Sequence, residues 1–442
     1  MKTYESMKSS SVFWLGMIPE HWECMKIGSL FSQRKNKVSD KDYAPLSVTK
    51  MGILPQLESA AKTNDGDNRK LVCAGDFVIN SRSDRKGSCG VSELDGSVSL
   101  INLVLTPRSE WNNRYAHYLL RSQPFSEEYY RYGRGIVADL WTTRFSEMKN
   151  IMLPVPPREE QDQIVRFLDW KVSEINRLIN IKHQSIKTLK ELMYAEIEKQ
   201  LAVYPVAEKV RLKQIGSFFK GGGFSRDNLV DDTRCPAILY GDIYTQYEYK
   251  TSRITHYVDV DAYAMSKKIA KGDIVMAGTG ETKDEIGKPI LYTGDEKVAV
   301  GGDVIVFSPH DNVNAEYILY QLYSQASLKH RYINGKGDII VHIYPTTLGN
   351  TTISLPSIED QKKAVIAINN IIDSVHETMD KLEREVAVLK EFSVRMISDV
   401  VTGKIDVRGI EVPEFEYVEE IEDNSDGEEE LEEKSGENTE DK

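Results

Sequence analysis

Residues 155–165 read VPPREEQDQIV, and residues 355–365 read LPSIEDQKKAV. Both stretches pass from an apolar residue and proline, through two acidic residues and a glutamine, into apolar sequence. Pro156 and Pro356 stand where a helix can begin, because the first helical turn does not use the N–H that proline lacks. The acidic residues that follow suit the positive end of a helix dipole. The sequence therefore predicts two long helices that start at corresponding points of two repeats.

The duplication covers most of the chain. Four further phrases recur in the same order, at offsets between 188 and 202 residues: IGSLF at 27–31 and IGSFF at 215–219, GDFVI at 75–79 and GDIVM at 272–276, YAHYLLRSQ at 115–123 and YILYQLYSQ at 317–325, and GRG at 133–135 and GKG at 335–337. Chance similarity would not keep this order over such distances. An internal repeat on this scale sets the whole architecture.

Each repeat has two parts. The first part mixes short β-rich runs, Gly-rich connections and one short helix, which is typical of a compact α/β domain. In the second part, alternating steps of three and four residues from Val165 and from Val365 meet mostly apolar side chains. Such a stripe predicts the seam of a coiled coil, and two amphipathic helices on separate globular cores are the alternative. The seam residues are Leu168, Ile175, Ile186, Leu189, Ile368, Val375, Val386 and Leu389. Lys182 interrupts the stripe, and we expect its ammonium group to reach out of the seam.

These patterns predict an α/β protein with a pseudo-two-fold internal repeat. The expected parts are two similar α/β domains at 1–157 and 204–357, two helices at 158–203 and 358–403, and a disordered acidic tail at 404–442. Short connections favour an antiparallel helix pair with the domains at its two ends. About 35 paired residues would make a rod of roughly 50 Å, or about 15 base pairs of DNA.

The net charge of −13 is unevenly distributed. From Glu411 onward the chain holds 16 Asp and Glu against 2 Lys, so the remainder is close to neutral. A near-neutral body can bind DNA when its cations gather on one face. The acidic end has few apolar side chains and is typical of a solubilising tail, with competition against polyanions as the alternative.

Other classes of protein are disfavoured. No run approaches the roughly 20 apolar residues of a membrane span, so we expect a cytoplasmic protein that does not contact a membrane. The four cysteines lie far apart without a C-x-x-C pair, which favours reduced thiols over a disulfide framework or a metal site. The VPPR phrase lacks both the polar residue and the aromatic ring of an amino-methyltransferase motif, and GETKDEIGKP lacks the spacing of a phosphate-binding loop. We therefore predict no catalytic residues.

The order of these parts resembles the specificity subunit of type I restriction-modification systems. The resemblance spans about residues 13–408 and is carried by the LPVPPREEQ and ISLPSIEDQ helix starts, by GMIPEHWE near the start, and by the GD phrases. It implies that each domain is a target recognition domain that reads one half of an asymmetric, bipartite site in double-stranded DNA, with the helices measuring the gap. It also implies two modification subunits that use S-adenosylmethionine to methylate adenine N6, and restriction subunits that use ATP and magnesium. None of these cofactors is expected on this chain.

Matched basic loops are the candidate DNA contacts. NSRSDRKGSCG at 80–90 carries Arg82, Arg85 and Lys86, and its repeat partner at 277–288 carries Lys283 and Lys288. In the second loop pair, Arg134 corresponds to Lys336, and each lies between glycines. A single loop cation is usually only solvated, but cations at matched positions favour phosphate and guanine contacts.

Two further expectations concern these loops. Arg82 and Arg85 correspond to Thr279 and Thr282, so the two half-sites should differ. Four nearby aromatic residues are more typical of packing, with base stacking as the alternative: Tyr130, Trp141, Tyr247 and Tyr249. A competing hypothesis for the whole chain is a cytoplasmic coiled-coil scaffold with duplicated protein- or glycan-binding domains. Binding to DNA with a steep salt dependence would distinguish the two.

Overall fold

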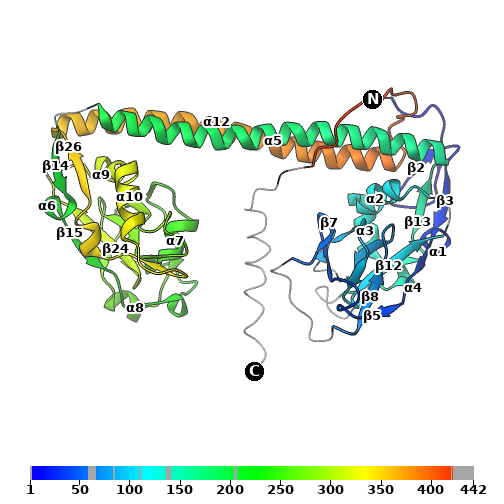
Figure 1. The fold of residues 1–442 in the computed structure, drawn as a ribbon, viewed down its shortest axis with the longest axis horizontal. Helices are drawn as coiled ribbons and strands as arrows, with labels where there is room; N and C mark the ends of the chain where they lie inside the picture. Colours follow the sequence, from blue (N-terminus) through cyan, green and yellow to red (C-terminus); the bar gives the residue numbers. More distant parts are fainter. Residues whose placement is uncertain are drawn as a thin grey trace. The chain divides into compact units, whose positions relative to one another are not determined.

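The structure is a computed structural model that describes residues 2–57, 66–82, 85–108, 111–135, 141–203, 207–419 and 421. The chain forms two compact units (Figure 1). Unit 1 comprises residues 1–184 and 382–442, and unit 2 comprises residues 185–381. We call the globular part of unit 1 head 1, within residues 2–157, and that of unit 2 head 2, within residues 207–357. Each unit also contains part of each long helix.

The two long helices are α5 (Arg158–Ala202) and α12 (Ile358–Val401). In unit 1, Ile179 on α5 and Val386 on α12 belong to one hydrophobic core. In unit 2, Met193 on α5 and Ile372 on α12 do the same. The early half of α5 therefore packs with the late half of α12, and the late half of α5 with the early half of α12. The predicted antiparallel helix pair is confirmed within each unit.

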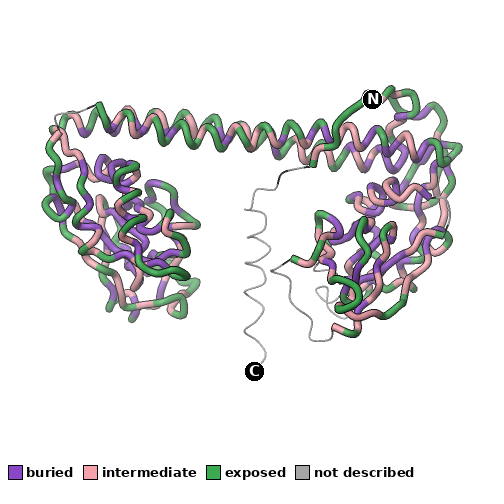
Figure 2. The backbone as a smooth tube through the Cα atoms, in the orientation of Figure 1, coloured by how far each residue is buried: buried purple, intermediate pink, exposed green. Residues whose placement is uncertain are grey.

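The predicted seam residues lie inward on the helices. Five are buried and three are half-buried, and the half-buried ones are Leu189, Val375 and Leu389. Figure 2 shows buried and exposed positions alternating along both helices, as expected for helices with one apolar stripe. Lys182 leaves the stripe as expected, because its ammonium group pairs with Glu385 of α12.

Head 1 is built on two small sheets and several short helices. A four-stranded sheet has the order β10 (Cys89–Val91), β9 (Phe77–Asn80), β12 (Asn102–Pro107) and β4 (Phe31–Gln33). A three-stranded sheet has the order β11 (Gly96–Val98), β8 (Arg69–Val72) and β5 (Lys37–Val38). Three strand pairs complete it: β1 (Met7–Ser9) with β2 (Met17–Pro19), β3 (Glu23–Lys26) with β13 (Met152–Val155), and β6 (Leu46–Thr49) with β7 (Gly52–Pro55).

The helices of head 1 are more numerous than the single short helix that the sequence indicated. They are α1 (Ile27–Leu30), α2 (Asn113–Arg121), α3 (Gln123–Arg131) and α4 (Phe145–Met148). Asn112 caps α2, because its side chain accepts the N–H groups of Arg114 and Tyr115. Pro124 lies in the first turn of α3, where its missing N–H leaves no bond unmade.

Head 2 repeats this plan with a larger main sheet. Its order is β15 (Gly216–Lys220), β24 (Val304–Pro309), β20 (Ile274–Ala277), β22 (Pro289–Tyr292) and β17 (Lys250–Thr251). A second sheet has the order β18 (His256–Tyr257), β16 (Pro236–Ile238), β23 (Val298–Val300) and β19 (Lys268–Ile269), and β14 (Glu208–Arg211) pairs with β26 (Thr352–Leu355). The helices are α6 (Leu212–Ile215), α7 (Tyr240–Thr245), α8 (Val260–Met265), α9 (Ala315–Leu322), α10 (Gln325–Asn334) and α11 (Pro345–Leu348).

Strand register corrects one of the predicted repeat matches. Phe31 pairs with Pro107 in head 1, and Gly216 pairs with Pro309 in head 2. Phe31 therefore corresponds to Gly216, whereas the match of IGSLF with IGSFF aligned Phe31 with Phe219. The identical letters lie three residues out of structural register, because α6 reads LKQI where α1 reads IGSL. The other matches agree with the structure, since α2 and α9, and β9 and β20, occupy equivalent places.

The chain beyond α12 differs from the tail predicted to begin at residue 404. Residues 404–419, which we call the C-terminal strap, lie against unit 1, with Val407 completely buried. Gln163 on α5 donates to the carbonyls of Val407 and Ile410 at 3.1 and 2.7 Å. Further along α5, Asn176 donates to the carbonyl of Val418 at 2.9 Å. Ile405, Ile410 and Val412 also pack against the core of unit 1. The most acidic stretch, residues 422–442, lies outside the described residues.

The cysteines and the long helices bear on two of the expectations from sequence. All four cysteines are free thiols, and Cys89 and Cys235 are buried. Within the described part of the chain, no helix combines the length and apolar character needed to cross a membrane.

Candidate nucleic-acid interface

The two predicted loops of head 1 meet at one residue, Thr142. Arg134 and Thr142 exchange backbone hydrogen bonds of 3.2 and 3.0 Å, and Arg82 also forms an antiparallel bridge to Thr142. The next residue, Thr143, donates its N–H to the carbonyl of Ser81 at 2.9 Å. Arg82 and Arg134 are both exposed. We call this arrangement of residues 82, 134 and 142 loop junction 1.

Head 2 builds the same junction from different side chains. Lys336 and His342 exchange backbone hydrogen bonds of 2.9 and 2.8 Å, and Thr279 pairs with His342 in the short β21–β25 ladder (Thr279–Gly280 and Val341–His342). Ile343 donates its N–H to the carbonyl of Gly278 at 3.0 Å, as Thr143 does to Ser81. The Oγ1 of Thr279 lies 3.0 Å from Nδ1 of His342. Residues 279, 336 and 342 form loop junction 2.

Glycine is required at loop junction 2. Gly337 has a φ of +115°, which L side chains rarely adopt, and an added Cβ would lie 2.0 Å from the carbonyl oxygen of Ile340. The GKG phrase therefore allows the chain to turn tightly beside Lys336, whose side chain remains exposed.

The other predicted cations of head 1 lie on the same loop as Arg82. Lys86 is exposed, and its Nζ lies 5.6 Å from the centre of the Tyr130 ring. Tyr130 also donates from its hydroxyl to the carbonyl of Arg82 at 3.5 Å. Arg85 is half-buried, and its backbone N–H bonds to the carbonyl of Arg82. Four of the predicted residues therefore lie in or beside loop junction 1: Arg82, Arg85, Lys86 and Arg134.

In head 2 the predicted lysines separate. Lys283 is half-buried in the loop before β22. Lys288 donates its Nζ to the carbonyl of Tyr244 at 3.2 Å, and burial lowers its pKa. It also lines a cavity of about 860 Å³ together with Arg331, whose pKa burial lowers to about 10. The ammonium group of Lys288 is therefore bonded within unit 2. At loop junction 2, the exposed cation is Lys336.

A basic hollow adjoins loop junction 1. This cavity of about 570 Å³ includes Ser81 and Thr142 in its lining, so it borders the junction directly. None of the described residues that line it is acidic. Four of them are cationic, namely Lys35, Lys70, Arg144 and Lys149. Cations gathered around a concave surface raise the local potential and favour phosphate groups.

Lys70 is held differently from the other cations of the hollow. Its Nζ donates to the carbonyls of Leu100 and Asn102, both at 2.6 Å. Burial and, secondly, the charge of Lys35 lower the pKa of Lys70. Arg144 and Lys149 follow Thr142 closely in the chain, so the phrase WTTRFSEMK could have indicated them. Lys35 and Lys70 come from distant segments, and nothing in the sequence connects them.

The aromatic residues divide between packing and surface. Tyr247 and Tyr249 are buried, as the packing interpretation expects. Trp141 is 38% exposed immediately before Thr142, and Tyr130 lies beneath Lys86. Of these four residues, Trp141 is the best placed to stack on a DNA base, because its ring is partly exposed beside the junction. Tyr130 instead contacts Lys86 and Arg82 of its own head.

Comparison with known proteins relates this geometry to DNA. The family model of the type I restriction modification DNA specificity domain matches twice, at residues 19–190 and 207–386. The type I restriction enzyme MjaVIII specificity subunit of Methanocaldococcus jannaschii is 22% identical over 432 residues, which cover 89% of this chain and 95% of that protein. A solved chain from work on assembly and conformational transition of the type I R-M system is 15% identical with a TM-score of 0.64. It covers 88% of this chain and 99% of its own, and this likeness concerns the fold.

Proposed function

Since this chain belongs to the type I restriction-modification DNA specificity family, we propose that it selects a bipartite DNA site for partner enzymes. Head 1 reads one half of the site and head 2 reads the other half. The chain itself carries no catalytic residues in this proposal, and its loops act by binding alone.

The observation that supports this proposal best is the repetition of the loop junction. Two chain segments, far apart in sequence, meet in the same backbone pattern in both heads. Each junction carries exposed cations, namely Arg82 and Arg134 in head 1 and Lys336 in head 2. Exposed cations near glycine-rich turns suit phosphate contacts, and arginine can also pair with guanine in the major groove. Different side chains on one framework suit two different half-sites.

The long helices set the gap between the half-sites in this proposal, and we call α5 and α12 the spacer helices. Each is continuous over more than 40 residues, from Arg158 to Ala202 and from Ile358 to Val401. A continuous helix changes its length only by whole residues of about 1.5 Å, which makes it a suitable measure of distance along DNA.

The chemistry belongs to partner subunits in this proposal. Two modification subunits that bind S-adenosylmethionine methylate adenine N6 at the selected site. Restriction subunits that use ATP and magnesium act on DNA in which the site is unmethylated. The similarity to a specificity subunit of a type I restriction enzyme, and to a chain from work on assembly of the type I R-M system, supports partners of this kind.

Methylation sequencing tests the proposal. Deleting the gene should remove one bipartite adenine mark from the genome, and restoring the gene should bring it back. Retention of every mark, in a strain where the wild-type chain and its methyltransferase are expressed, would contradict the proposal.

A binding measurement separates the proposal from the scaffold hypothesis. The chain with its methyltransferase partners should bind DNA with an affinity that falls steeply as salt rises, because phosphate contacts release counterions. A scaffold for proteins or glycans should show no such dependence.

A further inference from the structure

The glutamine of the first repeated phrase fastens head 1 to its spacer helix. Gln161 lies in the first turn of α5 and is 3% exposed. Its Oε1 accepts the backbone N–H of Asn112 at 3.0 Å, and its Nε2 donates to the carbonyl of Pro156 at 2.9 Å. These partners fix the orientation of the amide, because an N–H needs an acceptor and a carbonyl needs a donor. One buried side chain therefore joins the cap of α2 to the start of α5.

The second glutamine makes the same two bonds in head 2. Gln361 is 2% exposed in the first turn of α12. It accepts the N–H of Asn314 at 2.9 Å and donates to the carbonyl of Pro356 at 2.8 Å. Asn314 caps α9 as Asn112 caps α2. The repetition of two bonds with the same geometry indicates a role common to both heads.

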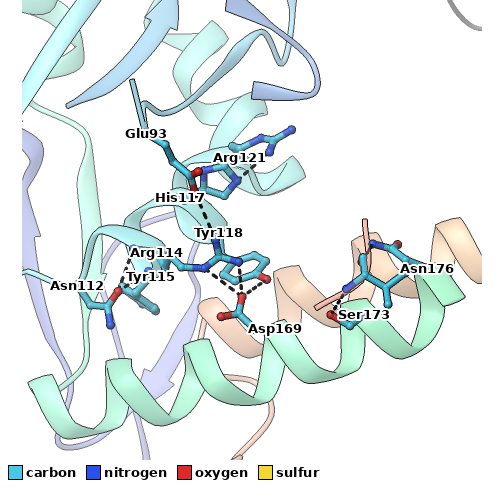
Figure 3. Close-up of polar contacts among 11 residues, drawn as sticks. Glu93, Asn112, Arg114, Tyr115, His117, Tyr118, Arg121, Asp169, Ser173 and Asn176 are labelled. Atoms are coloured by element: carbon cyan, nitrogen blue, oxygen red, sulfur yellow. Dashed lines mark hydrogen bonds and ion pairs between the residues drawn. The ribbon is translucent and has the colours of Figure 1, made fainter. Parts of the chain in front are cut away.

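A second contact joins the later part of α2 to α5 and the later part of α9 to α12. In Figure 3, Tyr118 of α2 and Arg114 meet Asp169 of α5. The hydroxyl of Tyr118 and Nη2 of Arg114 each lie 2.7 Å from Oδ1 of Asp169. In head 2, Tyr320 of α9 donates its hydroxyl to Oδ1 of Asn369 on α12 at 2.5 Å. The two contacts on each spacer helix are eight residues apart, which is about 12 Å along a helix.

Two separated contacts restrict a head more than one contact does. A single contact leaves the head able to pivot about that point. With Gln161 at one end and Asp169 at the other, α2 keeps a fixed direction along α5. The direction of each head relative to its spacer helix then decides where its loop junction lies along the helix.

We propose that Gln161 and Gln361 are positioning residues that fix each head on its spacer helix and thereby restrict the accepted gap. This inference rests on the proposed function. Glutamine suits the role because it supplies one acceptor and one donor without a charge. Glutamate would lose the donor and place a charge in a buried position, and an apolar residue would leave a backbone N–H and a carbonyl unpaired.

The experiment uses the full chain with its methyltransferase partners. Its substrates are DNA duplexes that carry both half-sites, identified with the wild-type complex, at the natural gap and at gaps one or two base pairs shorter or longer. Gln361→Leu should raise the ratio of methylation at the wrong gaps to methylation at the natural gap by about ten-fold. This is the size expected when buried hydrogen bonds are lost and their backbone partners stay unpaired. Gln161→Leu should do the same. Gln200→Leu is the matched control, because among the described residues the amide of Gln200 bonds only to Glu196 on the same helix.

A further variant distinguishes positioning from a loss of stability. Gln361→Glu regains the donor when its carboxyl group is protonated, and burial raises the pKa of a carboxyl. Its tolerance of wrong gaps should therefore fall as the pH is lowered, whereas that of Gln361→Leu should not change. An unaltered gap ratio in both leucine variants, or an equal loss of methylation at every gap, would overturn the inference. Failure of the wild-type complex to mark any bipartite site would instead overturn the proposed function.

Discussion

Loop junctions 1 and 2 have the same backbone pattern, but none of their three side chains is the same. Arg82, Thr142 and Arg134 in head 1 correspond to Thr279, His342 and Lys336 in head 2. The hydrogen bonds that both junctions share are made by the backbone, so they place no demand on side-chain identity. Loop junction 2 adds one side-chain contact, between Thr279 and His342. Substitutions at these positions can therefore change what a head recognises without changing how the junction is built.

The basic hollow extends this contrast beyond the junctions. Helices α4 and α11 occupy equivalent places, and Arg144 and Lys149 beside α4 correspond to Tyr344 and Gly349 beside α11. Head 1 therefore presents more positive charge around its junction than head 2 does at these two positions. In terms of the proposed function, head 1 should contribute more of the phosphate binding.

The largest expected effect comes from removing both arginines of loop junction 1. The Arg82→Ala, Arg134→Ala double variant should lower the rate of methylation of the bipartite site by about 100-fold, since each arginine contact is worth about 1–3 kcal/mol. The rate is measured with the assembled methyltransferase complex. Lys271→Ala serves as the control, because Lys271 is exposed and pairs with Asp295. An unchanged rate would place DNA recognition elsewhere in head 1.

A smaller effect should distinguish the attachments of the two heads. Asp169 accepts from both Arg114 and Tyr118, whereas the neutral Asn369 accepts from Tyr320 and Lys250. Asp169→Ala should destabilise unit 1 by about 2 kcal/mol and Asn369→Ala should destabilise unit 2 by about 1 kcal/mol. Hydrogen exchange of each unit at increasing urea concentrations measures both changes in the free energy of unfolding. A larger loss for Asn369→Ala would reverse the expected order.

The charge difference around the hollow predicts a change in salt dependence. Lys149→Ala should reduce the slope of log affinity against log salt by about 1, because one phosphate contact is lost. Tyr344→Arg adds a cation to head 2 at the position that corresponds to Arg144, and it should increase the slope by a similar amount if DNA follows an equivalent path over head 2. Filter binding at several salt concentrations provides both slopes. Equal slopes for wild type and Lys149→Ala would remove the hollow from the interface.

The smallest expected effect concerns Lys70. Because its pKa is lowered, Lys70 loses its charge at a lower pH than an ordinary lysine, so it attracts phosphate less as the pH rises. DNA affinity should fall by about two-fold more in wild type than in Lys70→Arg between about pH 7 and about pH 9.5, since arginine stays charged. Fluorescence anisotropy at constant ionic strength measures the difference. Parallel curves for the two proteins would show that Lys70 does not contact DNA.

The sequence was sufficient for the architecture because the architecture is repeated. The helix phrases around Gln161 and Gln361, and the apolar stripes behind them, each supply two independent indications of one structure. Repetition also identified Arg134 and Lys336 as equivalent, and the bridges to Thr142 and His342 place them so. The weakest match was IGSLF with IGSFF, where identical letters do not mark equivalent strand positions.

What the sequence could not supply depends on contacts between distant segments. Lys35 reaches the hollow from the connection between β4 and β5, and Lys70 reaches it from β8. No spacing in the sequence connects them to Arg144. The role of Lys288 could not be foreseen either, because its carbonyl partner on Tyr244 lies 44 residues away. The strap was missed since Val407 and Ile410 occur beside an acidic region, and their burial depends on the surface that α5 offers.

The strap has a consequence for the order in which the protein folds. Unit 2 is one continuous stretch of chain, residues 185–381, so a ribosome has made all of it before the rest of unit 1 appears. The core of unit 1 contains Trp22 and Leu168 together with Val400 and Val407. The N-terminal head, although synthesised first, therefore waits for residues close to the end of the described chain before its core is complete. Nascent chains should hold head 1 partly open until α12 arrives, which leaves its apolar surface accessible to chaperones for most of synthesis.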